Sequence, residues 1–284
     1  EKLNEILKQI PSIKKTLVYA YKKNEELNYE KFINFDKVLD ESKLDETFER
    51  FEFNHPIYIL YSSGTTGKPK CITHGAGNVL IEHNKEFMLH CDIRNNEKLF
   101  YYTTTGWMMW NWLVGGLATG SSIFLFDGAP TYPKIDVLLE YCQSKKINLF
   151  GVSAKYIDHL KNEKFNSKHL DLTSIKIITS TGSPLSEESF KYVYDNIKHD
   201  VHLASIAGGT DMVGCLVLGN LYSNVYKGEI QGQSLAIDVD VFTDDGKSVK
   251  DGEKGELVVK QPFPSMPVKF WGDESGEKYH KAYF

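Results

Sequence analysis

Cysteine is scarce in this chain, and long apolar runs and an excess of basic residues are missing. The four cysteines are Cys71, Cys91, Cys142 and Cys215. They form no CxxC pair, which favours unpaired thiols in a reducing compartment and argues against a structural zinc. No stretch approaches the roughly 18 apolar residues of a transmembrane helix, so we expect no membrane span. With a net charge of −5 and scattered lysines, the chain is not expected to bind nucleic acid.

The remaining composition is that of a globular protein, and we expect a cytoplasmic location. A length of 284 residues with 41% hydrophobic content suffices for one large or two medium domains with a full core. The chain begins at Glu1 rather than Met and ends abruptly at Phe284. We therefore expect it to be an internal piece of a longer protein.

Three regions differ in their residue pattern. Residues 1–55 are rich in Lys, Glu and Asn, with one convincing strand at 16–20, and are interpreted as the tail of a preceding α/β subdomain. Residues 56–222 alternate apolar strands with amphipathic helices, which predicts an α/β fold with a largely parallel sheet flanked by helices. Residues 223–284 contain alternating apolar and polar side chains and an Asp-Gly pair at 245–246 that marks a hairpin turn, which predicts a small β-rich subdomain.

Hydrophobic periodicity places the elements of the middle region. We expect strands at 56–60, 69–74, 99–102, 122–126, 148–152, 175–179 and 201–203. We expect helices to begin near Asn78, Pro133 and Ser186, because apolar residues recur at helical spacing after each of them. Residues 108–119 are apolar on all sides, which predicts a buried helix. Ligands in such folds bind beyond the carboxyl ends of the strands, so the loops there are the candidate sites.

The loop at 61–70, Tyr-Ser-Ser-Gly-Thr-Thr-Gly-Lys-Pro-Lys, concentrates anion-binding groups. Glycines bring backbone N–H groups close to a ligand, and the hydroxyls and lysines add donors and charge, so the loop suits a polyphosphate. It is not a Walker loop, because Gly64 and Gly67 are too close together and a strand follows instead of a helix. The alternative is an ordinary Ser/Gly-rich surface turn.

This strand, loop, strand order resembles the adenylate-forming superfamily of acyl-CoA synthetases, luciferases and peptide-synthetase adenylation domains. Their phosphate loop has the form Ser/Thr-Ser-Gly-Thr-Thr-Gly-x-Pro-Lys. The resemblance implies that ATP phosphates bind here and that Thr66 takes part in catalysis. The implied ATP-binding residues of the loop are Ser62, Ser63, Gly64, Thr65, Thr66, Gly67 and Lys70.

Two later loops resemble further superfamily motifs. Gly182-Ser183-Pro184 matches the segment that packs against adenine, although alone it would be a helix-entry turn. Gly209-Thr210-Asp211 resembles a Gly-x-Thr-Glu motif whose hydroxyl meets the α-phosphate and whose acid holds Mg²⁺. The resemblance implies that Thr210 and Asp211 are catalytic. Asp211 is shorter than Glu but keeps the hard oxygens that Mg²⁺ requires.

Trp107 begins a stretch with three tryptophans in six residues, which by itself predicts a core helix. The resemblance places Trp107 at an aromatic gate between the acyl pocket and the tunnel of the thiol acceptor. Met108 and Met109 would form an apolar, deformable pocket wall. Thr181 and Gly208 would line the same acyl and CoA pocket.

Longer strings resemble the acetoacetyl-CoA synthetase family, namely His-Gly-Ala-Gly at 74–77, Gly-Trp-Met-Met-Trp-Asn-Trp at 106–112 and Phe-Pro-Ser-Met-Pro at 263–267. This implies that acetoacetate attacks the α-phosphate of ATP, and that CoA then displaces AMP from the acyl-adenylate. ATP, Mg²⁺ and CoA would be required, within fatty acid metabolism. A ribose-binding Asp and a lysine-bearing domain would follow Phe284, so the chain alone is expected to be inactive.

Other functions stay open at this point. The chain fits an ATP-binding module that has lost catalysis and serves as a sensor or interaction surface, or a ligase for another short-chain acid. A phosphotransferase is disfavoured because no kinase-like catalytic loop is present. Acetyl-CoA synthetases carry Trp at the position that matches Gly208, so Gly208 predicts room for a four-carbon oxo-acid and Gly208→Trp should select against it. The alternative is that Gly208 needs a positive φ.

Overall fold

The computed structural model describes residues 2–21, 32–41, 47–62 and 69–284. The chain divides into two compact units, Glu1–Arg50 and Phe51–Phe284. The first unit contains the helices α1 (Lys2–Gln9) and α2 (Phe35–Glu41) and a parallel pair of short strands, β1 (Leu17–Val18) and β2 (Ile33–Asn34). The strand expected at 16–20 is therefore present but shorter. The domain boundaries expected after residues 55 and 222 stay predictions.

A five-stranded parallel sheet forms the centre of the second unit. Its spatial order is β6-β5-β7-β8-β9, and its neighbouring strands all run parallel. The strands are β5 (Lys98–Tyr101), β6 (Ser122–Phe124), β7 (Leu149–Ser153), β8 (Ile177–Thr181) and β9 (His202–Ser205). This sheet confirms the predicted α/β fold, and it brings the loops that follow β5, β8 and β9 to one edge.

Helices connect these strands in the order that the sequence predicted. They are α3 (Ala76–Lys85), α4 (Met108–Gly115), α5 (Val137–Lys145), α6 (Ala154–Asn162) and α7 (Glu187–Tyr192). Two end in π-helical turns, η1 (Glu86–His90) after α3 and η3 (Val193–Ile197) after α7, and α4 runs into a 3₁₀ turn, η2 (Gly116–Thr119). The predicted start at Pro133 is wrong. Asp136 has the non-helical N-cap conformation and pairs with His169, so the helix begins after it.

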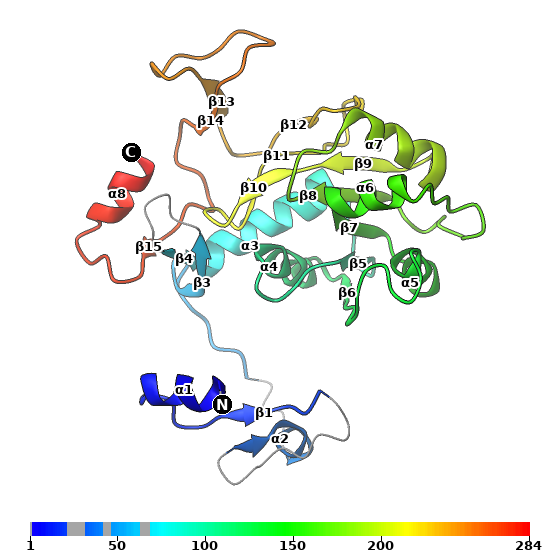
Figure 1. Cartoon of the computed structure of the whole chain (residues 1–284). Helices are drawn as coiled ribbons and strands as arrows, with labels where there is room; N and C mark the ends of the chain where they lie inside the picture. Colours follow the sequence, from blue (N-terminus) through cyan, green and yellow to red (C-terminus); the bar gives the residue numbers. More distant parts are fainter. Residues whose placement is uncertain (1, 22–31, 42–46, 63–68) are drawn as a thin grey trace. The chain divides into compact units, whose positions relative to one another are not determined.

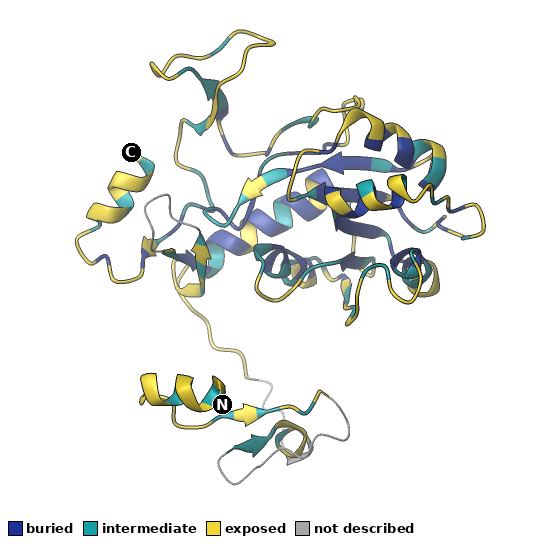
Figure 2. Cartoon of the chain, viewed as in Figure 1, coloured by how far each residue is buried: buried dark blue, intermediate teal, exposed yellow. Residues whose placement is uncertain are grey.

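Alternate residues of the central strands face two different cores. On one face Phe100, Phe150, Ile178 and Leu203 pack with apolar residues of α5, α6 and α7. On the other face Leu99, Leu149, Ile177 and Ala204 pack with Phe87 of η1 and Trp112 of α4. The sheet is thus covered by helices on both sides, as parallel sheets require, and most residues of β7, β8 and β9 are buried (Figure 2).

Smaller sheets complete the second unit. β3 (Pro56–Ser62) and β4 (Lys70–Gly75) are antiparallel neighbours, and β15 (Lys269–Phe270) joins β4. β10 (Ala207–Gly209), β11 (Gly214–Leu218) and β12 (Gly232–Gln233) form a second sheet, and β13 (Val239–Phe242) pairs with β14 (Glu256–Val259). The helix α8 (Glu277–Tyr283) ends the chain. The strand–loop–strand order around the predicted phosphate loop is therefore confirmed at both of its strands.

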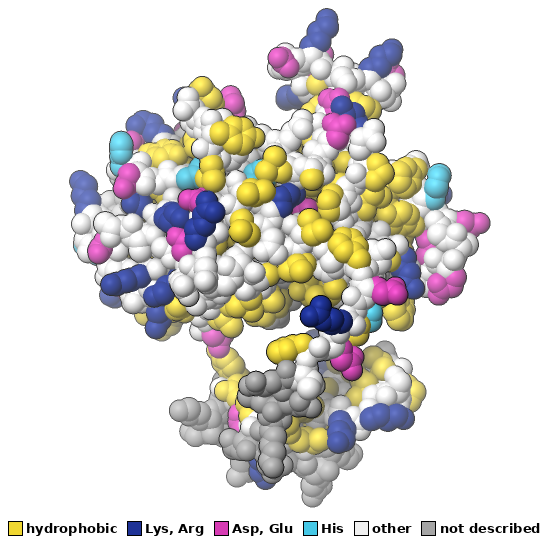
Figure 3. All heavy atoms as spheres, turned by 180° about the vertical axis from the view of Figure 1, so that it is seen from behind, with side chains coloured by type: hydrophobic (Ala, Val, Ile, Leu, Met, Phe, Trp, Pro, Cys, Tyr) yellow, Lys and Arg dark blue, Asp and Glu magenta, His cyan; other side chains and the backbone are white. Residues whose placement is uncertain are grey.

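The surface and the helices bear on two further expectations. In the described parts of the chain, every helix is too short or too polar to cross a membrane. On the face of the larger unit that Figure 3 shows, Lys and Arg side chains lie among acidic and hydrophobic ones. The basic side chains described on that face therefore form no continuous stripe.

Candidate functional site

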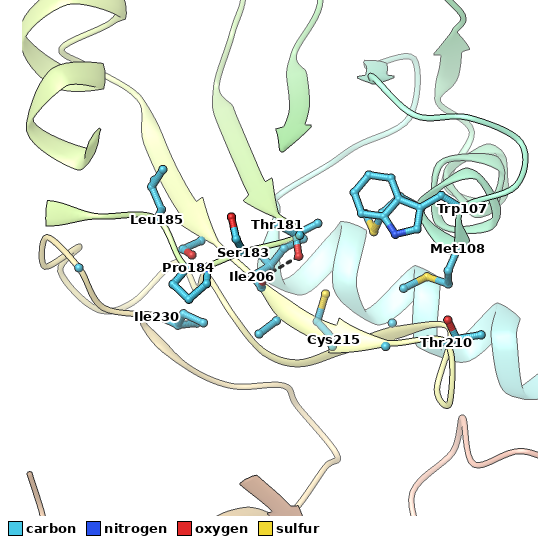
Figure 4. Close-up of a pocket in the computed structure, with 18 residues that line it drawn as sticks. Trp107, Met108, Thr181, Ser183, Pro184, Leu185, Ile206, Thr210, Cys215 and Ile230 are labelled. Atoms are coloured by element: carbon cyan, nitrogen blue, oxygen red, sulfur yellow. Dashed lines mark hydrogen bonds between the residues drawn. The ribbon is translucent and has the colours of Figure 1, made fainter. Parts of the chain in front are cut away.

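A cavity of about 520 Å³ opens at the carboxyl edge of the parallel sheet. Loops that are distant in the sequence converge on it, because parallel strands end at the same edge (Figure 4). Many residues predicted from the motifs line this cavity: Trp107, Met108, Met109, Thr181, Gly182, Ser183, Pro184, Gly208, Gly209 and Thr210. The structure therefore brings together the three motifs that follow β5, β8 and β9.

The loop after β8 forms the wall opposite the tryptophan. Thr181 ends β8, and its hydroxyl donates a hydrogen bond to the Ile206 carbonyl at 2.8 Å. Gly182 has φ of +89°, a conformation that side chains rarely adopt, and a Cβ there would lie 3.9 Å from the Trp107 ring. The ring of Trp107 packs edge-on against Tyr101, with the ring centroids 6.0 Å apart. The positive φ of this turn, rather than a lack of space in front of the indole, therefore calls for glycine.

Two buried histidines hold the turn that carries Thr210 and Asp211. His74 of β4 bonds to the Thr210 carbonyl at 2.8 Å, and His83 of α3 bonds to the Val213 carbonyl at 2.6 Å. Burial lowers the pKa of each ring to about 4, so both are neutral near pH 7. Since a carbonyl only accepts, Nε2 carries the proton and donates it in each bond.

Beneath the cavity lies a buried polar cluster built around Glu86. Its Oε1 accepts from the Cys215 amide and its Oε2 from the Trp112 indole, both at 2.6 Å. Glu82 accepts from Lys85 at 2.7 Å and from the Ser265 hydroxyl at 3.0 Å. Burial, together with the neighbouring Glu82, raises the pKa of Glu86 well above its ordinary value. Through its two bonds Glu86 joins α4 to β11.

Asp211 follows Thr210 at the rim of the cavity and is not itself among the described residues that line it, and it has two partners on the same oxygen. Its Oδ1 accepts from Lys70 Nζ at 2.8 Å and from the Tyr283 hydroxyl at 2.6 Å. About a third of each side chain of the ion pair is exposed, 29% for Lys70 and 35% for Asp211. The Lys70 ammonium also lies 5.1 Å from the centre of the Tyr283 ring. Two residues predicted at separate motifs, Lys70 and Asp211, thus lie in direct contact.

Asp211 also fits the binding mode expected for Mg²⁺ with a nucleotide. Among the described residues, no group of three or more His, Cys, Asp or Glu side chains could hold a metal by itself. Mg²⁺ commonly uses one or two carboxylates plus substrate phosphates rather than a full protein cage. A single, partly exposed carboxylate at the rim matches that mode.

The structure describes only the two ends of the predicted phosphate loop. Ser63, Gly64, Thr65, Thr66 and Gly67 lie outside the described residues. Ser62 ends β3, and its buried hydroxyl has no hydrogen-bond partner among the residues that the structure describes. The roles assigned to this loop stay predictions.

Gly208 lines the cavity, but not for the reason that the sequence suggested. A Cβ at Gly208 would lie 1.9 Å from the Gly214 carbonyl oxygen and 2.5 Å from the Cys215 Cα. The position therefore points at the backbone of β11, and Gly208 is not among the residues with positive φ. Neither a missing indole nor a left-handed turn explains this glycine; close approach of two strands does. Gly208→Trp would displace β11 and is no clean test of acid selection.

Sequence reasoning missed several residues that line the cavity. Ile206, Cys215 and Ile230 contribute apolar or thiol surface (Figure 4). Ile206 lies between two predicted motifs, so its position two residues before Gly208 was a usable signal. Cys215 and Ile230 come from segments whose place at this edge depends on the β10–β11 pairing, which periodicity did not reveal.

Comparison with known proteins gives consistent relatives. Acetoacetyl-coenzyme A synthetase of Rhizobium meliloti is 56% identical over 238 residues, covering 84% of this chain and 36% of the relative. Acetoacetyl-CoA synthetase of Gallus gallus is 46% identical over 294 residues, covering 100% and 44%. The chain thus spans less than half the length of the curated relatives it matches.

A solved structure and a family model extend this similarity. Acetoacetyl-CoA synthetase from Streptomyces lividans superposes with a TM-score of 0.91 at 36% identity, covering 99% of this chain and 44% of that one. This agreement confirms the predicted adenylate-forming fold. The family model described as AMP-binding enzyme matches residues 1–266. The chain therefore belongs to the AMP-binding enzyme family.

Proposed function

We propose that the intact protein is an ATP-dependent acid–thiol ligase that converts acetoacetate to acetoacetyl-CoA through an acyl-adenylate. The observation that carries the proposal is the convergence of Trp107, Gly182 and Thr210 on one cavity. Membership of the AMP-binding enzyme family and the similarity to acetoacetyl-CoA synthetases support it. A cytoplasmic location remains part of the proposal.

The reaction proceeds in two steps. A carboxylate oxygen of the acid attacks the α-phosphorus of ATP, and pyrophosphate leaves with the electrons of the broken P–O bond. The CoA sulfur then attacks the acyl carbon, and AMP leaves. Neither step needs covalent chemistry from the protein, so its residues act by positioning and by neutralising charge.

The residues around the cavity divide these tasks. Gly182, Ser183 and Pro184 would pack against adenine, and the Thr210 hydroxyl would meet the α-phosphate. Thr66 and Lys70 would hold the β- and γ-phosphates. Asp211 would hold Mg²⁺, which offsets phosphate charge when it is bound. Lys70 and Asp211 form an ion pair with each other. Binding of the phosphates to Lys70 and of Mg²⁺ to Asp211 would therefore have to break this pair.

The acyl group would occupy the apolar side of the cavity. Met108 and Met109 line the cavity there and would give the acyl group deformable walls. Trp107 lies near Met108 (Figure 4) and would separate this side from the path of the thiol. A cavity of about 520 Å³ has room for a four-carbon acid beside a nucleotide phosphate. An acid of one or two fewer carbons would leave a void and lose contact energy.

A second candidate is an ATP-binding module without catalysis, which the shorter Asp211 in place of Glu would favour. Exchange of labelled pyrophosphate into ATP by the intact protein separates the two. A ligase exchanges only when acid is present, and faster with acetoacetate than with acetate. Tight ATP binding with no exchange under any acid would contradict the ligase.

The loop is tested in the same assay with Thr66→Ala. Loss of a charge-assisted hydrogen bond to phosphate should cost about 1.5–3 kcal/mol, or roughly 10- to 150-fold in rate at limiting ATP. Thr173→Ala is the matched control, because Thr173 sits in an exposed turn on Asp171 and away from the cavity. Equal rates for both variants would mean that the loop is only a turn.

A further inference from the structure

The turn between β10 and β11 holds one residue in a strained conformation. Val213 has φ of +53° and is fully buried. A β-branched residue with positive φ is a genuine outlier, and such strain persists only where the surroundings enforce it. Val213 lies two positions after Asp211 and three after Thr210, so whatever enforces its conformation also fixes those two residues.

His83 contacts the strained residue from below. Its Nε2–H donates to the Val213 carbonyl at 2.6 Å, and the side chain is 1% exposed. The other side of the ring faces helix α4, where a Cβ on Gly115 would lie 1.9 Å from His83 Nδ1. The ring is therefore wedged between α4 and the turn, with its one proton aimed at Val213.

Glu86 lies one helical turn after His83 and holds the backbone of Cys215, two residues after Val213. Its Oε1 accepts from the Cys215 amide at 2.6 Å, while its Oε2 is fixed by the Trp112 indole. Between these two anchors, a Cβ on Gly214 would lie 2.8 Å from Glu82 Oε1 and 3.0 Å from Glu86 Oε1. The backbone of 213–215 thus lies directly on α3 and η1, and it is bonded at both ends.

We propose that His83 and Glu86 are positioning residues that hold Val213 in its left-handed conformation and thereby place Thr210 and Asp211 for the adenylation step. This rests on the proposed function. Neither side chain lies among the described residues that line the cavity, so both act through the turn. Ordinary core packing is the competing explanation, and it predicts a loss of stability without a specific effect on the turn.

The test uses strain relief in the intact protein. His83→Leu removes the donor at similar volume, whereas His83→Gln keeps an N–H near the position of Nε2. Each is made alone, and His83→Leu is also combined with Val213→Gly or with Val213→Ala. Glycine adopts positive φ freely and alanine does not, yet both remove the buried valine methyl groups. The two double variants are therefore matched for cavity formation and differ in strain.

Two readouts are taken. In acid-dependent pyrophosphate exchange, loss of the bond should lower kcat at least about tenfold in His83→Leu and leave the KM for ATP within about threefold. His83→Gln should keep kcat within about threefold of the unaltered protein. Adding Val213→Gly should restore most of kcat, and adding Val213→Ala should not. Without substrates, amide hydrogen exchange of peptide 209–215 should quicken in His83→Leu and slow again only with Val213→Gly.

Several outcomes would overturn the proposal. These are equal behaviour of the two double variants, a fall in stability with kcat unchanged, or unaltered hydrogen exchange at 209–215. If the unaltered protein shows no pyrophosphate exchange, the proposed function fails, and hydrogen exchange still decides whether the turn is held in this way. If His83→Leu does not fold, His83→Asn replaces it, because its amide is too short to reach the Val213 carbonyl.

Discussion

Two groups of polar residues contact the same turn, and they differ in their access to water. Beneath the turn, His83 and Glu86 are buried and bonded to fixed backbone groups. At the rim, Lys70, Asp211 and Tyr283 bond to one another at a partly exposed site. A buried partner that is removed leaves an unpaired group, whereas water or a ligand can replace an exposed one. The buried contacts of the turn are therefore fixed, whereas its exposed contacts can be replaced by water or a ligand.

The largest effect is expected on the buried side, for Glu86→Leu. This change leaves the Cys215 amide and the Trp112 indole N–H without an acceptor, at a cost of about 1–3 kcal/mol for each donor. Denaturant unfolding of the protein should show this loss. Glu140→Leu is the control, because Glu140 forms an exposed pair with Lys134 and its loss should cost under about 1 kcal/mol. Equal losses for both variants would contradict the comparison.

A second effect on the buried side depends on pH. Burial holds the pKa of His83 at about 4, below its ordinary value of 6.5, so the unfolded chain binds the proton more readily. Stability is therefore complete above about pH 6.5 and falls as the pH drops toward 4, by roughly 3 kcal/mol for this residue. Unfolding free energies measured from pH 7 to pH 4 should show a smaller decline in His83→Gln than in the unaltered protein. Parallel curves would mean that His83 is not held neutral.

The sequence predicted the central sheet and most of the cavity for a physical reason. Apolar strands buried on both faces are recognisable as continuous runs. The motifs at their ends, such as Gly182-Ser183-Pro184, are recognisable because the residues that define each motif are adjacent in the sequence. The α/β fold and the convergence of Trp107, Thr181 and Thr210 were predictable on that basis.

What sequence reasoning missed depends on contacts between distant segments. The helix α3 was predicted, but not that His83 and Glu86 lie 129 to 130 positions before their partners. A buried histidine gives no local sign in the sequence of the carbonyl to which it donates, so the bond from His83 to Val213 was not predicted. The interpretation of Gly208 was wrong for the same reason. What requires glycine there is the close approach of the β11 backbone, a distant segment, and not a positive φ at Gly208 itself.

On the exposed side, Asp211→Asn should affect catalysis more than folding. Asn keeps an acceptor for Lys70 and Tyr283, so stability should change by less than about 1 kcal/mol. The loss of charge should weaken binding of Mg²⁺ with ATP and slow pyrophosphate exchange by roughly 10- to 150-fold, the range of about 1.5–3 kcal/mol. Asp195→Asn is the control, because Asp195 pairs with Lys191 in an exposed helix. Unchanged exchange in Asp211→Asn would exclude Asp211 as a metal ligand.

The smallest effect is expected for Tyr283→Phe, and its direction is opposite. The Tyr283 hydroxyl donates to Asp211 Oδ1 at 2.6 Å, so it competes with any cation for the same oxygen. Burial, with this hydrogen bond to Asp211, raises the pKa of Tyr283 above its ordinary value, which keeps the proton on the hydroxyl. Removing the hydroxyl should lower the Mg²⁺ concentration for half-maximal exchange by up to about tenfold, because the lost hydrogen bond contributes at most about 1.5 kcal/mol.

Tyr279→Phe is a close control, since Tyr279 lies on the same helix and donates instead to the Pro267 carbonyl. An equal shift in both variants would show that packing of α8 is responsible, and a higher Mg²⁺ requirement in Tyr283→Phe would mean that the hydroxyl supports the metal site rather than competing with it.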